Sequence, residues 1–243
     1  MTEKTMPGFG NEHQSEAVSG TLPVGQFSPQ KPPDGLYTEK FSATAFTAPR
    51  SENRRTWFYR IRPSVVAGRY QPIDQPRLLT APRRELRTPP EQMRWDPIEV
   101  PTGAIDFVDG LQTVVMNGDA ATQIGMAAHL YLANRSMERR YFYSADGELL
   151  IVPQAGGIKI RSECGVLSIV PGEIALIPRG MKFAVDLLEK TARGYICENY
   201  GQQFRLPERG PVGSDGYAND RDFLAPAAAY EDLQGEFELL CKF

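Results

Sequence analysis

The sequence predicts an all-β protein: an antiparallel sandwich of the jelly-roll type, with an extended N-terminal arm and few short helices. Residues 146–183 give the clearest signal, because short apolar and β-branched runs alternate there with Gly, Pro and Asp, as in strands joined by tight turns. No part of that stretch has the period of an amphipathic helix. With 243 residues, of which 41% are hydrophobic, the chain can bury a substantial core.

The N-terminal segment, residues 1–56, is rich in Gly, Pro, Ser, Gln and Asn and has little hydrophobic periodicity. Such a composition is typical of a disordered tail or of an extended arm held against a partner surface. Aromatic residues recur along the segment, which a solvated tail does not require: Phe9, Phe27, Tyr37, Phe41 and Phe46. We therefore expect an ordered, extended arm.

The predicted sandwich occupies residues 57–226 and contains most of the predicted strands. Residues 72–102 are punctuated by prolines, and we expect them to form an irregular coat. We expect residues 207–226 to be a long structureless loop that has a function or contacts another subunit. Strands are predicted at residues 57–62, 111–116, 126–133, 149–152, 158–160, 166–170, 174–177, 182–187, 194–199 and 236–243.

An arginine-rich stretch, residues 50–94, has 11 arginines, four acidic residues and no lysine. Arginine in place of lysine suits bidentate pairing with carboxylates. Three interpretations stay open for this stretch: a solvated basic face, contacts between subunits, and RNA binding.

The composition excludes several classes of protein. The chain has 27 Lys and Arg against 30 Asp and Glu, a net charge of −3, which argues against general affinity for nucleic acid or acidic membranes. Its three cysteines, Cys164, Cys197 and Cys241, are widely spaced and indicate buried thiols in a reducing compartment. Neither a signal peptide nor an apolar stretch long enough to span a membrane is present in the sequence. We therefore expect a cytoplasmic protein.

A turn motif lies at the centre of the predicted strands. Pro171-Gly172 predicts a tight turn into a strand, and Pro178 with Gly180 predicts a turn out of it. With Gly165 upstream, this spacing resembles the second motif of the cupin superfamily, in which metal-binding members carry a histidine ligand three residues after the last glycine. The present chain has Phe183 at that position.

The partner motif of metal-binding cupins, a pair of histidines followed by a glutamate, corresponds to residues 134–143. That window contains Glu138 and no histidine, so it cannot supply two imidazoles and a carboxylate to one metal. We expect a cupin-like barrel whose metal site is replaced by packing. His129 lies between Ala128 and Leu130 and is expected to be a hydrogen-bonded core residue. An unrecognised metal site that combines His129 with Glu138 or Glu198 stays as an alternative.

Several segments together resemble homogentisate 1,2-dioxygenase, in order and over nearly the whole chain: residues 8–12, 45–50, 55–61, 136–138, 150–154, 179–181 and 218–224. The likeness covers only the N-terminal part of that family. It implies a two-domain, cupin-like enzyme, assembled as trimers paired into a hexamer. Such an enzyme opens the ring of homogentisate with O₂ to give 4-maleylacetoacetate in tyrosine and phenylalanine breakdown.

The resemblance implies a non-haem Fe(II) held by two histidines and one glutamate, with a further histidine as acid and base, all in the C-terminal domain. The present chain has two histidines, His13 and His129. We therefore assign no catalytic, cofactor-binding or metal residue, expect no cofactor on this chain itself, and expect the chain alone to be inactive. Residues 227–243 are interpreted as the start of the catalytic domain.

An alternative interpretation of the chain is that it is a stand-alone, metal-free, cupin-like binding module. It would bind a small carboxylate through arginines at the barrel mouth, such as Arg140 or Arg179.

Overall fold

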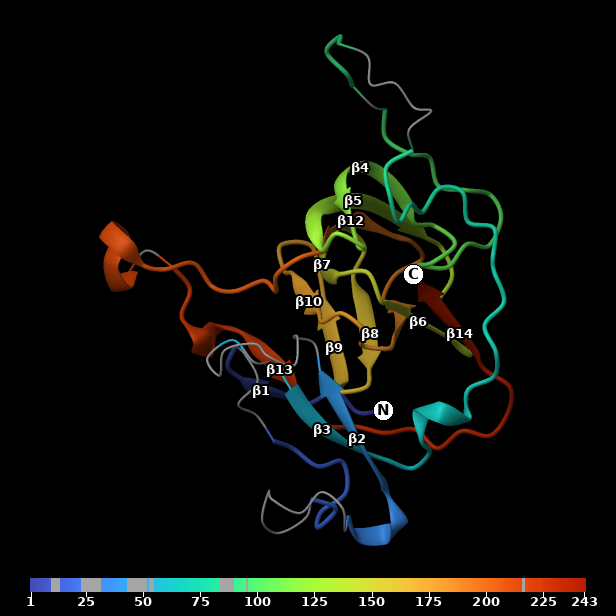
Figure 1. Cartoon of the computed structure of the whole chain (residues 1–243), viewed down its shortest axis with the longest axis vertical. Coiled ribbons are helices and arrows are strands. Elements are labelled where there is room, and N and C mark those ends of the chain that lie inside the picture. The colour runs from blue at the N-terminus through green and yellow to red at the C-terminus, as the bar shows by residue number, and fades with distance from the viewer. Residues whose placement is uncertain are drawn as a thin grey trace. The chain divides into compact units, whose positions relative to one another are not determined.

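Strands make up almost all of the regular structure (Figure 1). The computed structural model describes residues 1–9, 14–22, 32–42, 52, 55–83, 90–94, 96–215 and 217–243. The strands are β1 (Thr5–Pro7), β2 (Tyr37–Ser42), β3 (Arg55–Arg60), β4 (Gln112–Asp119), β5 (Ile124–Ala133), β6 (Arg140–Ser144), β7 (Glu148–Ala155), β8 (Ile158–Ser162), β9 (Gly165–Ile169), β10 (Ala175–Ile177), β11 (Phe183–Leu187), β12 (Ala192–Asn199), β13 (Leu224–Pro226) and β14 (Glu238–Lys242). The predicted all-β class is confirmed.

The central strands pair in a nested order. β5 pairs with β12, β6 with β11 and β7 with β10, and β8 lies next to β9. A chain folded double in this way and then rolled up is a jelly roll. The two resulting sheets have the orders β10-β7-β12-β5-β4 and β14-β6-β11-β8-β9, which confirms the predicted sandwich.

The chain divides into two compact units. Unit 1 comprises residues 1–73, 161–167 and 205–235, and unit 2 comprises residues 74–160, 168–204 and 236–243. Unit 2 holds most of the jelly roll. Unit 1 holds the short sheets β1-β13 and β2-β3, together with the tip of the β8–β9 hairpin.

In unit 1, the N-terminal strand β1 pairs antiparallel with β13, with Met6 opposite Ala225. The expectation of a structureless loop over residues 207–226 is therefore wrong. That segment contains β13 and two 3₁₀ helices, Gly210–Asp215 and Asp220–Asp222. An Asn219–Asp222 capping box stabilises the second helix, since each side chain bonds the other residue's backbone N–H. These short elements were not predicted because the segment is rich in proline, glycine and polar residues, which are typical of loops.

The second sheet of unit 1 joins β2 to β3 in antiparallel register, and Phe41 stacks on Phe58 with ring centroids 5.4 Å apart. Strand β2, which belongs to the predicted N-terminal arm, is thus one strand of a two-stranded sheet rather than an isolated extended segment. The anchors Phe27 and Phe46, and also His13, lie outside the described residues.

Several arginines of the Arg-rich stretch make contacts within their own unit. In unit 1, Arg60 pairs with Glu39 at 2.6 Å and Glu163 at 2.7 Å, and Arg62 pairs with Asp232. The expected pairing of arginine with carboxylates therefore occurs within one chain. A role of this stretch between subunits stays a prediction.

An aromatic cluster forms the core of unit 2. Phe107 contacts Tyr131 and Phe183, with centroids 5.1 and 6.0 Å away, and Phe183 also contacts Phe142 at 5.7 Å. All four rings are almost completely buried. Because successive strand residues point to opposite faces, alternate residues of β5, β6 and β11 supply this core.

The last strand, β14, pairs with β6 in parallel, with Leu240 opposite Phe142. It forms one edge of its sheet. The described part of residues 72–102 has no helix or strand, as expected for an irregular coat. The segment contacts β4, because the Thr113 N–H donates a hydrogen bond to the Arg77 carbonyl at 2.8 Å.

Candidate functional site

A group of charged and polar side chains is buried inside the sandwich of unit 2. Glu198 is 0% exposed. Its Oε1 accepts a hydrogen bond from the Ser144 hydroxyl at 2.6 Å, and its Oε2 lies 3.0 Å from His129 Nε2 and 2.9 Å from Lys242 Nζ. Lys242 also pairs with the buried Asp146 carboxylate. We call His129, Ser144, Asp146, Glu198 and Lys242 the buried charge network.

Strand alternation directs these side chains inward. His129 shares the inner face of β5 with Ala127 and Tyr131, all buried. Glu198 follows the buried Ile196 by two residues on β12, and Lys242 follows the buried Leu240 by two on β14. A carboxylate and an ammonium therefore occupy positions where the pattern calls for an apolar residue.

The electrostatics of Glu198 are set by its partners. Burial by itself would raise the pKa of this carboxyl, because the charged form loses its hydration. The His129 hydrogen bond, the Lys242 charge and the Ser144 hydroxyl overcome that effect and lower the pKa to about 2. Glu198 is therefore an anion at neutral pH, and its charge is compensated inside the protein.

Tyr200 adds an aromatic wall to the network. Lys242 Nζ lies 5.4 Å from the centroid of its ring, within the range of a cation–π contact. Burial, and then the charges of Glu198 and Asp146, raise the pKa of the Tyr200 phenol. The phenol consequently stays neutral and adds no negative charge to the two carboxylates.

His129 links the network to β4. Its Nδ1 lies 2.9 Å from the Thr113 hydroxyl oxygen, which also accepts a hydrogen bond from the Leu79 backbone N–H at 2.9 Å. The order hydroxyl, imidazole, carboxylate is that of a catalytic triad. Here, however, the hydroxyl oxygen is engaged by the backbone and the imidazole is only 2% exposed. We assign His129 a structural role, and the expectation of a hydrogen-bonded core histidine is confirmed.

Comparison with protein families gives a match over residues 4–243 to the family described as homogentisate 1,2-dioxygenase N-terminal. This chain belongs to that family. The resemblance inferred from the sequence segments is thereby confirmed.

Solved structures with similar folds are far more distant. A Klebsiella pneumoniae protein described as having a double-stranded β-helix domain is 14% identical, with a TM-score of 0.35; the match covers 50% of this chain and 97% of that one. KdgF from a Halomonas species is 13% identical, with a TM-score of 0.32 and coverages of 45% and 88%. A cupin-2 domain protein from Shewanella frigidimarina is 18% identical, with a TM-score of 0.27 and coverages of 30% and 70%.

The buried charge network does not fit a metal ion such as Fe(II), which the homogentisate dioxygenase resemblance places in the C-terminal domain. His129 Nε2 and Glu198 Oε2 are hydrogen-bonded to each other, so they do not both point toward one position that a metal ion could occupy. The Lys242 ammonium lies on the same carboxylate oxygen and would repel a second cation. Within the described ranges, no three His, Cys, Asp or Glu side chains form a group that could hold a metal ion. The alternative metal partner Glu138 is exposed.

Phe183, which stands where metal-binding cupins carry a histidine, is fully buried in the aromatic cluster of unit 2. Its edge-to-face contacts with Phe107 and Phe142 have interplanar angles of 72° and 78°. Such contacts stabilise a core. The ring is therefore part of the packing of β6 and β11.

The two arginines named for the carboxylate-binding alternative lie in different surroundings. Arg140 already pairs with Asp106, Asp109 and Glu238. Burial alone would lower the pKa of its guanidinium, but these three carboxylates raise it. Arg140 is thus engaged within the protein, whereas the half-buried Arg179 has no ion pair to any residue that the structure describes.

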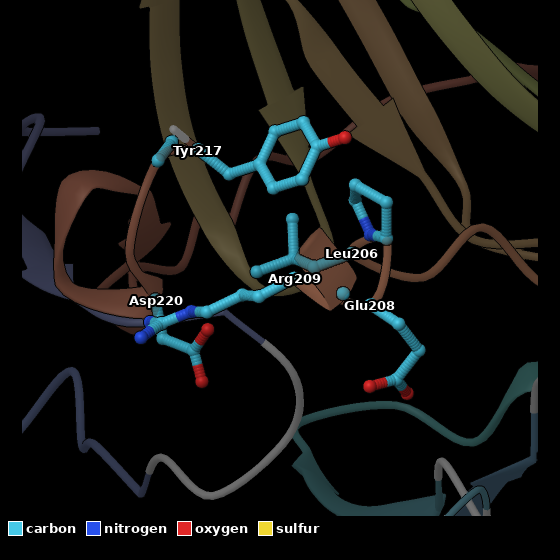
Figure 2. A pocket seen from close by; sticks show the side chains of 8 residues that line it. Leu206, Glu208, Arg209, Tyr217 and Asp220 are labelled. Carbon is cyan, nitrogen blue, oxygen red and sulfur yellow. The ribbon is translucent and has the colours of Figure 1, made fainter. Parts of the chain in front are cut away.

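A shallow pocket of about 400 Å³ lies in unit 1, in the segment between residues 206 and 220. Figure 2 shows the Tyr217 ring on one side and the Arg209 side chain extending toward Asp220. Arg209 donates a hydrogen bond to Asn219 Oδ1 at 2.7 Å. The lining residues are Leu206, Pro207, Glu208, Arg209, Gly210, Tyr217, Ala218 and Asp220.

Sequence reasoning missed Lys242 and Asp146, which complete the network. The alternation in residues 238–242 could have revealed Lys242, because it is two residues after Leu240 and so lies on the same face of the strand.

Among the described residues, no helix has the length and apolar character that crossing a membrane requires.

Proposed function

We propose that this chain is the N-terminal part of a homogentisate 1,2-dioxygenase. The complete enzyme would open the ring of homogentisate with O₂ to give 4-maleylacetoacetate, both oxygen atoms entering the product, in tyrosine and phenylalanine breakdown. The family match over residues 4–243 supports this proposal. Iron(II) would be held by histidines and a glutamate outside this chain.

The chain itself would have a structural role. The observation that carries this part of the proposal is the position of Lys242, whose ammonium lies 2.9 Å from Glu198 and also pairs with Asp146 inside the sandwich. An internal cation neutralises the carboxylates that could otherwise attract a metal. The jelly roll would therefore support the catalytic domain without taking part in the oxygen chemistry.

The assembly and location follow as further parts of the proposal. The complete enzyme would be a homo-oligomer, with trimers paired into a hexamer, and would work in the cytoplasm. All three cysteines are free thiols, which supports a reducing compartment.

Oxygen uptake by the purified chain tests the proposal. With Fe(II) and homogentisate, we expect no uptake above a metal-free blank, while a complete homogentisate dioxygenase in the same assay consumes O₂. Because the network does not fit a metal, excess Fe(II) added without oxygen should leave the melting temperature unchanged. Uptake by the chain alone, or a rise in melting temperature that His129→Ala abolishes, would contradict the structural role.

A further inference from the structure

The ammonium group of Lys242 has the surroundings of a bound ligand. Its Nζ lies 2.9 Å from Glu198 Oε2, pairs with the Asp146 carboxylate and lies 5.4 Å from the centroid of the Tyr200 ring. All four residues are buried. An ammonium group has three N–H donors and no acceptor, so two carboxylates and an aromatic face compensate its charge away from water. We call Asp146, Glu198 and Tyr200 the ammonium site.

The ammonium site is held together by contacts that do not involve Lys242. The Ser144 hydroxyl donates a hydrogen bond to Glu198 Oε1 at 2.6 Å and accepts one from the Asp146 backbone N–H at 3.2 Å. His129 Nε2 lies 3.0 Å from the other carboxylate oxygen of Glu198. All of these groups lie outside β14. The site is therefore preorganised for a cation, whichever molecule supplies it.

Strand β14, which supplies Lys242, is attached to unit 2 by few contacts. It is an edge strand (Figure 1), and within the described ranges it pairs with β6 alone, in parallel. Residues 205–235, which precede it, belong to unit 1. Of its five residues, only Leu240 and Lys242 are buried. Because segments with few buried apolar contacts open at a lower free energy than the core, we expect β14 to open locally while the rest of unit 2 stays folded.

Opening of β14 withdraws the cation from the ammonium site. The two carboxylates then lie in the interior without a compensating charge, which is costly. A free cation of the right shape would relieve that cost, and Lys242 itself defines the shape. Beyond Cβ, its side chain consists of three carbons and the ammonium nitrogen, which are the heavy atoms of n-propylammonium. Guanidinium is planar and tetramethylammonium has no N–H to donate, so neither matches the site.

We propose that Asp146, Glu198 and Tyr200 form a binding site for unbranched primary alkylammonium ions, which Lys242 fills as long as β14 is docked. Strand β14 acts as a latch: its docking closes the site, and its release opens the site to a free amine. This goes beyond the structural role proposed above, because it assigns a class of ligand to the interior of unit 2. It does not depend on the reaction of the complete enzyme.

Rescue of Lys242→Ala by amines tests the class of ligand. n-Propylammonium should raise the melting temperature of this variant in a saturable way, by about 3 °C or more at ten times its dissociation constant. Tetramethylammonium, which has no N–H, and 1-propanol, which has no charge, should raise it much less at the same concentration and ionic strength. If the variant is unfolded without a ligand, cooperative unfolding that appears only with n-propylammonium is the same result.

Two further variants show where the amine acts. Lys190→Ala removes an exposed lysine and should respond to n-propylammonium no more than wild type does. Glu198→Gln combined with Lys242→Ala keeps the space for the amine and removes one carboxylate, so this double variant should lose most of the rescue. No rescue of Lys242→Ala, rescue of equal size by tetramethylammonium, or undiminished rescue of the double variant would each overturn the proposal.

Hydrogen exchange of the wild-type chain, followed by peptide mass spectrometry, tests the latch. The peptide that covers β14 should exchange faster than the peptides of β5 and β12. n-Propylammonium at ten times its dissociation constant should accelerate exchange in β14 by about tenfold, because it binds only the open form. Exchange in β5 should stay unchanged, and 1-propanol should have no such effect. Exchange of β14 that merely follows the rest of unit 2, or that n-propylammonium leaves unchanged, would contradict the latch.

Discussion

Lys242 is the residue on which the interior of unit 2 depends most. Its ammonium lies between the carboxylates of Asp146 and Glu198, and its side chain is only 3% exposed. A buried ion pair gains little over a well-packed apolar pair, but removing one partner leaves a charge in a low-dielectric interior. The cost of substitution is therefore much larger than the net value of the pair.

We expect Lys242→Met to lower the free energy of unfolding by about 3–5 kcal/mol, because two buried carboxylates lose their cation. Urea unfolding measures this loss. Lys190→Met, at an exposed lysine, should change stability by no more than about 0.5 kcal/mol. Equal effects of the two substitutions would show that Lys242 is not the cation that compensates the network.

Glu198 should make the stability depend on pH in acid. Its pKa falls from 4.5 to about 2 in the folded protein, so the unfolded chain binds the proton first as the pH falls. The contribution is complete above about pH 4.5, and is lost as the pH falls toward 2. Its size is on the order of 3 kcal/mol, since one pKa unit corresponds to about 1.4 kcal/mol.

The difference between wild type and Glu198→Gln isolates this contribution. Urea unfolding at a series of pH values should show a steeper loss of stability for wild type than for the variant over that window. Parallel curves would mean that the Glu198 carboxylate is not held ionised by its partners.

At the scale of elements, strands β12 and β7 come close together at Gly194. A Cβ at this position would lie 2.2 Å from the Val152 backbone oxygen and 2.7 Å from the Tyr131 ring. Neither the backbone of a central strand nor a buried ring can move far in a close-packed interior.

Gly194→Ala should therefore destabilise the protein by about 1–3 kcal/mol, the usual cost of overpacking. Gly68→Ala is the matched control, because nothing lies within 4 Å of a Cβ there. Thermal unfolding of both variants provides the measurement. If Gly194→Ala melts at the wild-type temperature, the two strands are farther apart than described.

Strand periodicity predicted the existence of most elements of the jelly roll, since inner and outer residues alternate with a period of two. It could not predict β13, because Leu224–Pro226 is too short to show a period and gains its partner from β1, more than 200 residues away. Lys242 and Asp146 escaped for a related reason: charged residues look solvated along the chain, and only the folded sheets bring these two together with Glu198, which the sequence offered only as a metal partner of His129.

At the scale of the whole molecule, the jelly-roll topology and the family could both be predicted, the first from turn spacing and the second from ordered segments over residues 8–224. From the sequence, we expected the packing of Phe183 to replace a metal site. The structure shows in addition that Lys242, on a different strand, is buried and pairs with Glu198. That pairing depends on β14, whose parallel partner β6 is about 98 residues earlier.

The nested strand pairing has a consequence for how the molecule reaches its native state. The β8–β9 hairpin closes a loop of a few residues, whereas β5 and β12 meet only after more than 50 residues lie between them. Loop closure costs more entropy as the loop lengthens, so folding should zip outward from the hairpin, with the β5–β12 seam last. Pulsed hydrogen exchange during refolding should thus protect amides of the hairpin before those of the seam.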